Sequence, residues 1–277
     1  MRRVLIVLLA LFVLAGGGFA ATGGPLADLR PDVITEAPQP EREAKGRALL
    51  DSAWRAAGGE QTLDHDTVSF TFEDTWVGVG TLFNPWPDDA QRARITQRVH
   101  SFDSRVELEN GPAADTTWGI TDGRGWTEQS GAATPSDDPD LLFMLPTVHY
   151  FVEMPQRFTE APIARFVEER TIRGRTYDVV FVSWETPLAH DAHDQYLVHI
   201  DQETGRVGIV HYTVRAIGRF VTGVGHLLDQ REVDGVWIPH RMPVTTAVDA
   251  DPADHLHEML LSDVRWDAEP VEVTRGP

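Results

Sequence analysis

The chain contains no cysteine and a single lysine, Lys45, among its 277 residues. Without cysteine it has no disulfide and no thiol that can carry a lipid anchor after export, so its stability rests on its core. Acidic residues outnumber basic ones by 43 to 24, which gives a formal net charge of −19. A surface of this sign repels nucleic acid and anionic lipid head groups, so we expect neither as a partner. We attribute the charge to solubility rather than to an acidic binding face.

Sequence signatures of catalysis are also missing. No Gly-x-Ser-x-Gly motif occurs, and the lack of cysteine removes thiol chemistry. A facing pair of carboxylates of the glycosidase kind stays open, but the abundance of acids makes that pattern uninformative. No repeat of fixed period is present, which argues against a propeller or a solenoid. We therefore predict a non-enzymatic protein without a cofactor, and a hydrolase is the alternative.

Long apolar runs are confined to the N-terminus. A basic start, Met-Arg-Arg, precedes an apolar run over residues 4–14, and small residues at 18–21 follow at the spacing of a cleavage site. Three glycines at 16–18 make this run a poor membrane-spanning helix. We predict a cleaved signal peptide over residues 1–21, with an uncleaved anchor as the alternative. The protein is then periplasmic or secreted, and it is not a lipoprotein.

The next segment predicts a linker and then a helix. Residues 22–40 are rich in Gly, Pro and Ala and show little periodicity, which is typical of a flexible linker. Apolar side chains then recur at helical spacing over residues 41–57, and a Gly-Gly pair supplies the stop. Beyond this helix most of the chain consists of short strand-like runs, and a chain of this length fits one large all-β domain. We therefore predict a single domain over residues 41–270.

A second helical region covers residues 137–158, where Leu and Val recur at helical spacing. Asp137 or Asp138 is suited to cap its start. Pro146 and Pro155 interrupt the pattern, which predicts one or two short helices.

The rest of the chain is typical of an antiparallel sheet. Between residues 194 and 242, alternating apolar runs are separated by polar turns, which predicts a meander. Asp234-Gly235 and Asp122-Gly123 are strong hairpin signals, because a tight turn needs residues that tolerate positive φ. A large sheet must curl, since its twist accumulates. We predict a mainly β (α+β) fold, in which a strongly curved antiparallel sheet of about 11 strands forms an incomplete barrel covered by two or three helices.

The order of these features resembles a known group of proteins. The motifs that carry the resemblance are Ala56-Ala57-Gly58-Gly59 at a helix end, the Val68-Ser69-Phe70 strand, the Asp122-Gly123-Arg124-Gly125-Trp126 hairpin, the Met154-Pro155 helix end and the meander over 194–242. Together with the export signal, they resemble uncharacterised exported bacterial proteins that are similar to the outer-membrane lipoprotein-sorting proteins, the lipoprotein localisation factors. The resemblance covers most of residues 41–267. It implies a half-barrel whose apolar cavity accommodates acyl chains, and it implies no catalytic site.

Aromatic residues on the predicted strands and helices exceed what a thin core requires. The candidates for lining a ligand cavity are Phe70, Phe72, Trp76, Trp118, Trp126, Phe143, Phe151, Phe181, Tyr196, Tyr212 and Trp237. Ordinary core packing is the alternative interpretation of the same residues. We predict a monomer whose cavity binds a lipid, an acyl chain or another long apolar ligand. A module that binds another protein of the cell envelope is a further alternative.

His190, Asp191, His193 and Asp194 form the densest group of metal-capable side chains, and Zn²⁺ accepts these ligand types. They lie in a polar loop without a distant third ligand of recognisable spacing, so we predict a solvated loop and no metal. The hydrolase alternative would place its chemistry in the same loop. His255 and His257 alternate on a later strand, but a second His at the helical offset of a metalloprotease is lacking.

Overall fold

The computed structural model describes residues 25–267, so the predicted signal peptide over 1–21 lies outside the described residues. The helices are α2 (Pro40–Ala56), α3 (Gly59–Thr62), η1 (Gly78–Phe83, a 3-10 helix) and α4 (Pro139–Thr159). The strands are β1 (Thr67–Trp76), β2 (Ala90–Arg98), β3 (Ser104–Leu108), β4 (Thr116–Thr121), β5 (Arg124–Gln129), β6 (Ala132–Pro135), β7 (Ile163–Ile172), β8 (Arg175–Ser183), β9 (Gln195–Asp201), β10 (Val207–Thr213), β11 (Thr222–His226), β12 (Leu228–Val233), β13 (Val236–Thr245) and β14 (His257–Trp266).

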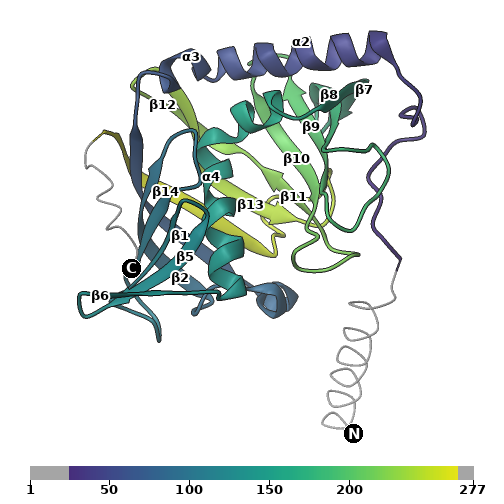
Figure 1. The fold of residues 1–277 in the computed structure, drawn as a ribbon. Coiled ribbons are helices and arrows are strands. Elements are labelled where there is room, and N and C mark those ends of the chain that lie inside the picture. The colour runs from purple at the N-terminus through teal and green to yellow at the C-terminus, as the bar shows by residue number, and fades with distance from the viewer. Residues whose placement is uncertain (1–24, 268–277) are drawn as a thin grey trace, which may run out of the picture.

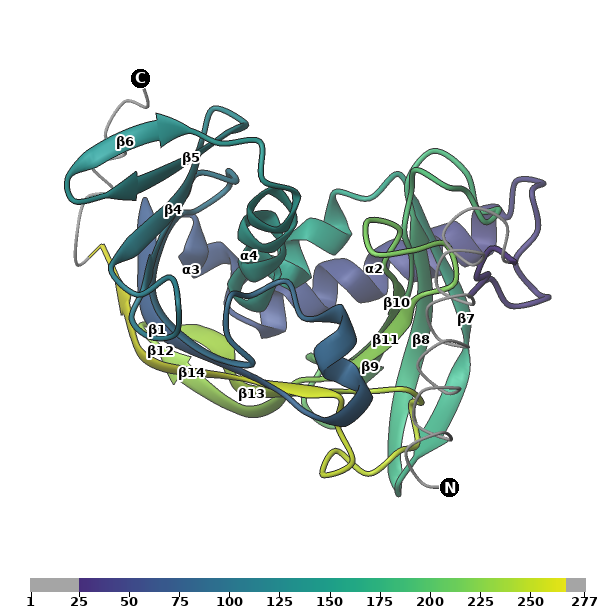
Figure 2. The same cartoon turned by 90° about the horizontal axis from the view of Figure 1, so that it is seen from below.

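Within residues 25–267 the strands form one antiparallel sheet of 14 strands. Their order is β6-β5-β4-β3-β2-β1-β14-β13-β11-β10-β9-β8-β7, and β12 pairs with β13 beside this path. Within the described chain the end strands β6 and β7 do not pair with each other, so the sheet stays open. Figure 1 shows α2 along one rim of the sheet, and Figure 2 shows the sheet bending around α4. The predicted incomplete barrel is therefore confirmed.

The sheet has more strands than the approximately 11 that the sequence predicts. Two of the additional strands, β6 and β11, have four and five residues. Their sequences, Ala-Ala-Thr-Pro and Thr-Gly-Val-Gly-His, carry few β-branched or aromatic side chains, so alternation does not reveal them. β11 also changes the predicted meander, because β13 pairs with β12 along its first half and with β11 near its end.

In the described part of the chain, four hairpins close through two-residue turns in which both residues have positive φ. The turn pairs are Asp122-Gly123, Ser130-Gly131, Arg173-Gly174 and Asp234-Gly235. Positive φ at both positions is the signature of the type I′ turn, whose twist matches that of the flanking strands. The two hairpins predicted from Asp-Gly pairs are confirmed.

One continuous helix, α4, replaces the one or two short helices predicted over 137–158. Asp138 accepts a hydrogen bond from the backbone N–H of Asp140 at 2.9 Å, which confirms the predicted cap. Pro146 and Pro155 both lie inside the helix. Each removes one backbone hydrogen bond at a cost of about 3 kcal/mol in an isolated helix. Ten buried residues along α4 offset that cost by packing in the concave side of the sheet.

Buried polar groups fasten the C-terminal half of α4 to the loop between β2 and β3. The carboxylate of Glu153 accepts hydrogen bonds from the backbone N–H of His100 at 2.6 Å and from Arg157 at 2.5 Å. Arg157 also donates to the carbonyl of Ser101 at 2.6 Å. Burial acts to raise the pKa of Glu153, but hydrogen bonding and charge from His149, with Arg157 and the His100 amide, lower it overall. Glu153 therefore holds the helix as a carboxylate.

The segment 25–39, part of the predicted linker, lies against the sheet face opposite to α4. Ile34 is fully buried there in a cluster with Val179 and Phe181. The guanidinium of Arg165, on the same face, donates to the carbonyl of Thr35. We propose that this segment belongs to the folded domain rather than to a flexible linker. Among the described helices, none is both long and apolar enough to cross a membrane.

Candidate functional site

The centre of the concave face is closed by α4. Phe72 of β1 lies edge-on to Phe151 of α4, with 5.6 Å between the ring centroids. Trp86 stacks on Trp118 of β4 at 5.7 Å. Phe70 is fully buried in the same core. Of the predicted cavity residues, Phe70, Phe72, Trp118 and Phe151 therefore pack as core in this structure.

Trp126 lies on the face opposite to α4. It pairs across the β4–β5 hairpin with Gly119, and a Cβ on Gly119 would lie 2.0 Å from the Trp126 ring. The preceding residue, Gly125, faces Leu141 of α4. Since neighbouring residues of a strand point to opposite faces, Trp126 points away from the concave side. Trp126 is therefore not part of the candidate site.

Phe181 and Trp237 also lie on the opposite face. Phe181 packs against Ile34 of the N-terminal segment in the cluster described above. Trp237 lies between two residues of the concave core along β13, and the guanidinium of Arg206 lies 3.8 Å from the centroid of its ring. The alternation of apolar and polar residues thus identifies both as strand residues. The tertiary structure places them on the face opposite to the concave side.

The concave face beside α4 carries a group of half-buried aromatic side chains, which we call the aromatic patch. The patch consists of Phe143, Tyr150, Trp184, Tyr196 and Tyr212. The ring of Tyr196 lies 5.6 Å from that of Trp184 and 6.5 Å from that of Tyr212. Phe143 and Tyr150 lie two turns apart on one side of α4. Tyr196 and Tyr212, two of the residues predicted to line a cavity, are brought together here, and Phe143, a third, lies about 10 Å from Tyr150 along α4.

The phenols of the aromatic patch are uncharged. Burial raises the pKa of Tyr196 well above its usual value, and the neighbouring charge of Asp194 acts in the same direction. Burial also raises the pKa of Tyr212, and the negative charge of Asp74 adds to that effect. The patch therefore offers apolar ring surface with neutral hydroxyl groups.

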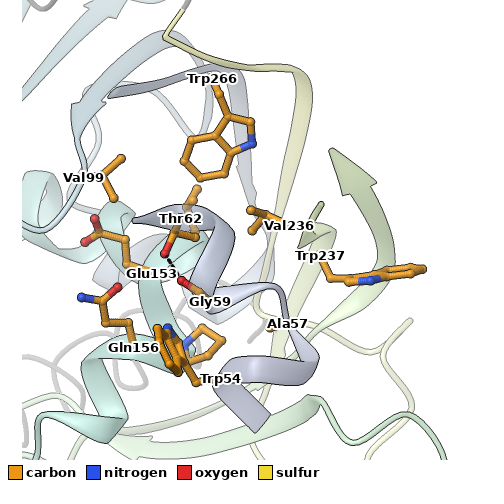
Figure 3. A pocket seen from close by; sticks show the side chains of 12 residues that line it. Trp54, Ala57, Gly59, Thr62, Val99, Glu153, Gln156, Val236, Trp237 and Trp266 are labelled. Carbon is orange, nitrogen blue, oxygen red and sulfur yellow. Dashed lines mark hydrogen bonds between the residues drawn. The ribbon is translucent and has the colours of Figure 1, made fainter. Parts of the chain in front are cut away.

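A small cavity lies at the end of the concave side, where α2, α3 and α4 meet (Figure 3). Its volume is about 20 Å³. That space is enough for about one water molecule. Trp54 lies beside Gln156 on one side of it, and the ring of Trp237 points away from it. This cavity does not accommodate an acyl chain.

A larger cavity of about 490 Å³ lies elsewhere, at the place where β12 leaves the main path of the sheet. Its lining includes Tyr177 and Ile209, which belong to an apolar cluster on the face opposite to α4. Arg175, Arg206 and Asp201 give this cavity a polar lining. It is therefore not the apolar space between sheet and helices that the sequence predicts.

A buried carboxylate at the edge of the concave core was not among the predicted site residues. Asp74 of β1 is fully buried, and its Oδ2 accepts hydrogen bonds from Nε1 of Trp76 at 2.9 Å and of Trp86 at 3.0 Å. Its Oδ1 lies 2.9 Å from Nδ1 of His257. The His257 ring stacks on Trp76 at 3.8 Å with an interplanar angle of 5°. Three N–H donors thus compensate the burial of this charge.

The sequence signal for this group is weak but present. Asp74 lies between Phe72 and Trp76 at a position of β1 whose side chain points to the concave side, where an apolar side chain is expected. A charged residue in that position must find partners. The sequence around His257 is tested against a metalloprotease motif alone, and that motif is lacking.

The His190 loop does not assemble a site in this structure. His190 Nδ1 accepts from the backbone N–H of Ala192 at 3.0 Å, and His193 Nε2 lies 3.0 Å from Glu185 of the same loop. Asp194 is turned to the sheet, where it accepts from Thr213 at 2.7 Å. Burial raises the pKa of Asp194, although its hydrogen bond with Thr213 acts to lower this pKa. Within residues 25–267 no group of three or more acidic or histidine side chains is placed to hold a metal ion.

The arrangement of sheet and helices matches solved structures. A LolA superfamily protein from Nitrosomonas europaea is similar at a TM-score of 0.52 and 12% identity, over 81% of this chain and 94% of that chain. The chain has the lipoprotein-sorting half-barrel fold. A putative outer membrane lipoprotein-sorting protein domain from Vibrio parahaemolyticus matches this half-barrel at a TM-score of 0.51 and 12% identity, over 83% and 95% of the two chains.

The resemblance that the turn motifs predict is confirmed at the level of the fold. No protein-family model matches the sequence, and no curated protein matches it either. At 12% identity the likeness shows the half-barrel fold alone, and the activity has to be argued from the site.

Proposed function

We propose that this half-barrel is an exported cell-envelope protein that binds a lipid or another long apolar ligand on its concave face, without catalysis. The observation that carries the proposal is the aromatic patch, five half-buried rings gathered beside α4. Ligand sites are concave and mostly apolar, with a few polar groups that fix orientation. The patch meets that description, and the fold shared with lipoprotein-sorting domains supports it.

The proposed position of the ligand follows from the packing. The centre of the concave side is occupied by fully buried rings such as Phe70 and Phe72. Their displacement would cost several kcal/mol. An acyl chain that lies along Tyr196 and Tyr212 leaves this core in place. We therefore place the chain beside α4 rather than beneath it.

Titration with a fluorescent C16 fatty acid, followed by displacement with unlabelled lipids of eight to eighteen carbons, tests the proposal. Each buried methylene contributes about 0.8 kcal/mol, so affinity should rise by about fourfold per methylene until the patch is covered. Salt should not release the ligand, because apolar burial is insensitive to screening or is slightly strengthened by it.

Two charge substitutions make the test specific. Tyr196→Asp should weaken binding by at least tenfold, because it puts a carboxylate on the apolar site. Phe220→Asp is the matched control, since Phe220 is 41% exposed in the β10–β11 turn and is not one of the five patch residues. Circular dichroism should show that both variants keep their strand content. Absence of saturable binding at every chain length would remove the proposal.

A protein-binding module is the second candidate, and one surface feature favours it. The segment 77–83 exposes Val79 and Leu82 to 67% each, with Phe83 at 38%. Exposed apolar side chains that are contiguous often mark contact surfaces. This candidate is supported instead if the protein binds no lipid and the Val79→Asp variant no longer binds an envelope protein that the unmodified protein binds.

Export remains part of the proposal. The features that predict it lie in residues 1–21, outside the described chain. Comparison of the mass of the protein recovered from the periplasm or medium with that of the full chain tests cleavage at residues 20–21. For the His190 loop, the contacts among the described residues do not support a hydrolytic site, and we do not propose one.

A further inference from the structure

The buried group around Asp74 lies next to the aromatic patch. His257 is in register with Val244 of β13, and Val244 is in register with Gly225 of β11. The ring of Tyr212 lies across Gly225, since a Cβ on this glycine would lie 3.8 Å from Cε1 of Tyr212. Neighbouring strands are about 4.8 Å apart, so the edge of the patch is about 10 Å from His257 along the sheet.

The side chains of this row point to the same side of the sheet. Val244 belongs to the concave core, and so does Trp76, the cross-strand partner of His257. Tyr212 packs against that core as well. A chain that lies on the patch can therefore reach His257 without crossing the sheet.

Asp74 determines which nitrogen of His257 faces a ligand. A carboxylate only accepts hydrogen bonds, so Nδ1 of His257 carries the proton that it donates to Asp74. The stack on Trp76 fixes the plane of the ring. Among the described residues no hydrogen bond uses Nε2, and the side chain keeps 11% of its surface exposed. In the neutral ring Nε2 is then an acceptor held in one direction.

The negative charge around His257 determines which type of ligand head group can bind at Nε2. The Asp74 carboxylate lies directly behind the ring, and the chain as a whole carries a net charge of −19. A carboxylate or phosphate head group placed at Nε2 would be repelled by both. A hydroxyl group donates a hydrogen bond to an acceptor nitrogen and adds no charge.

We infer that the ligand of the concave face is an amphiphile with an uncharged, hydroxyl-bearing head group, such as a glycerol ester or a long-chain alcohol, whose hydroxyl donates to Nε2 of His257 while the chain lies on the aromatic patch. This inference rests on the proposed function, and it adds the chemical class of the ligand and the residue that holds its polar end. Asp74 acts as a positioning residue, because it orients His257 and does not touch the ligand.

Three C12 ligands with equal chains test the inference by displacement of the fluorescent fatty acid. They are 1-monododecanoylglycerol, methyl dodecanoate and dodecanoate. One hydrogen bond to a positioned acceptor should make the glycerol ester bind about tenfold more tightly than the methyl ester. Dodecanoate should bind no better than the methyl ester. The ¹⁵N resonance of Nε2 of His257 should shift with the glycerol ester and not with the methyl ester.

His257→Asn is the informative variant. Its amide nitrogen takes the place of Nδ1 and keeps the hydrogen bond to Asp74, whereas no atom takes the place of Nε2. In this variant the glycerol ester should bind at most about twofold more tightly than the methyl ester. The affinity for the methyl ester should stay as in the unmodified protein. His257→Gln, which keeps a polar group near the position of Nε2, should restore part of the preference.

The outcomes separate this inference from the function on which it rests. If the methyl ester binds and the glycerol adds nothing, or if the preference survives in His257→Asn, the assignment of His257 is wrong and lipid binding stands. Tighter binding of dodecanoate would show an acidic ligand and would also overturn the assignment. If the fluorescent fatty acid itself shows no saturable binding, lipid binding fails and the assignment fails with it.

Discussion

Nδ1 of His257 lies 2.9 Å from Oδ1 of Asp74, although the two residues are 183 positions apart in the chain. The contact joins β1 to the start of β14, the strand next to it in the sheet. The other oxygen of the same carboxylate accepts from the indoles of Trp76 and Trp86. One buried charge thus organises three rings at the edge of the concave core.

Asp74→Ala should lower the free energy of unfolding by about 3–5 kcal/mol, because it leaves the N–H donors of two buried indoles and of the partly buried His257 without an acceptor and opens a small cavity. Chemical denaturation measures this change. Glu73→Ala is the matched control, since Glu73 is the preceding residue, is exposed and pairs with Arg92 on the surface. Its effect should stay within about 1 kcal/mol. Equal effects for the two variants would show that the Asp74 network is not a stabilising contact.

His199 should make the protein sensitive to mild acid. Burial lowers its pKa to about 4, although its hydrogen bond to the carbonyl of Leu197 acts to raise it. The unfolded chain, with an ordinary pKa of about 6.5, binds more protons between these two values. Stability should therefore fall as the pH falls from about 6.5 to about 4, by about 3 kcal/mol for this residue.

Replacement of His199 by Leu tests this expectation. The free energy of unfolding, measured by denaturation at several pH values, should fall less steeply below pH 6.5 in His199→Leu than in the unmodified protein. His211 and His226, whose pKa values are also lowered mainly by burial, account for part of the remaining slope. His190→Gln, in the exposed loop, is the control and should follow the unmodified protein. An unchanged slope in His199→Leu would contradict the assignment.

Substitution of Gly46 by Ala should not stabilise the protein, although this substitution usually stabilises a helix. In an α-helix Ala is favoured over Gly by about 1 kcal/mol. A Cβ on Gly46 would, however, lie 2.7 Å from the carbonyl oxygen of Ala164 in β7. Gly46→Ala should therefore destabilise the protein, by about 1–3 kcal/mol, because α2 must move away from the sheet. Ala48→Gly, at an exposed position of the same helix, measures how helix propensity alone changes the stability of the protein. A more stable Gly46→Ala variant would argue against the close approach.

Ile34 should contribute to stability as a core residue does, despite its place in a segment with the composition of a linker. Ile34→Ala should cost about 2–4 kcal/mol in the free energy of unfolding, because the side chain is fully buried over β7 and β8. Val33→Ala is the control, since Val33 is 43% exposed. Limited proteolysis that removes residues 25–39 without a change in stability would support a linker after all.

Local signals in the sequence predict local structure well. The Asp122-Gly123 and Asp234-Gly235 turns are confirmed because positive φ at two successive residues depends on those residues alone. The end of α2 is confirmed for the same reason, since Gly58 takes a φ of 80°. The continuity of α4 through two prolines is not predictable in this way, because it depends on burial in the concave side of the sheet.

The candidate site is predictable only in part. Alternation along a strand tells which residues share a face, but it does not tell which face is concave. For this reason alternation nominates all four of Tyr196, Tyr212, Phe181 and Trp126, whereas in the structure the first two lie beside α4 and the last two point to the other side.

The amino-acid sequence by itself determined the class of the fold, the hairpins and the resemblance to lipoprotein-sorting half-barrels, because turn chemistry and alternation act between residues that are close in the chain. Only the tertiary structure decided which aromatic side chains meet beside α4 and that His257 lies against Asp74. Those relationships depend on strand order and on the direction in which the sheet curves. Both follow from the burial of the whole apolar surface at once, which no single segment of the sequence encodes.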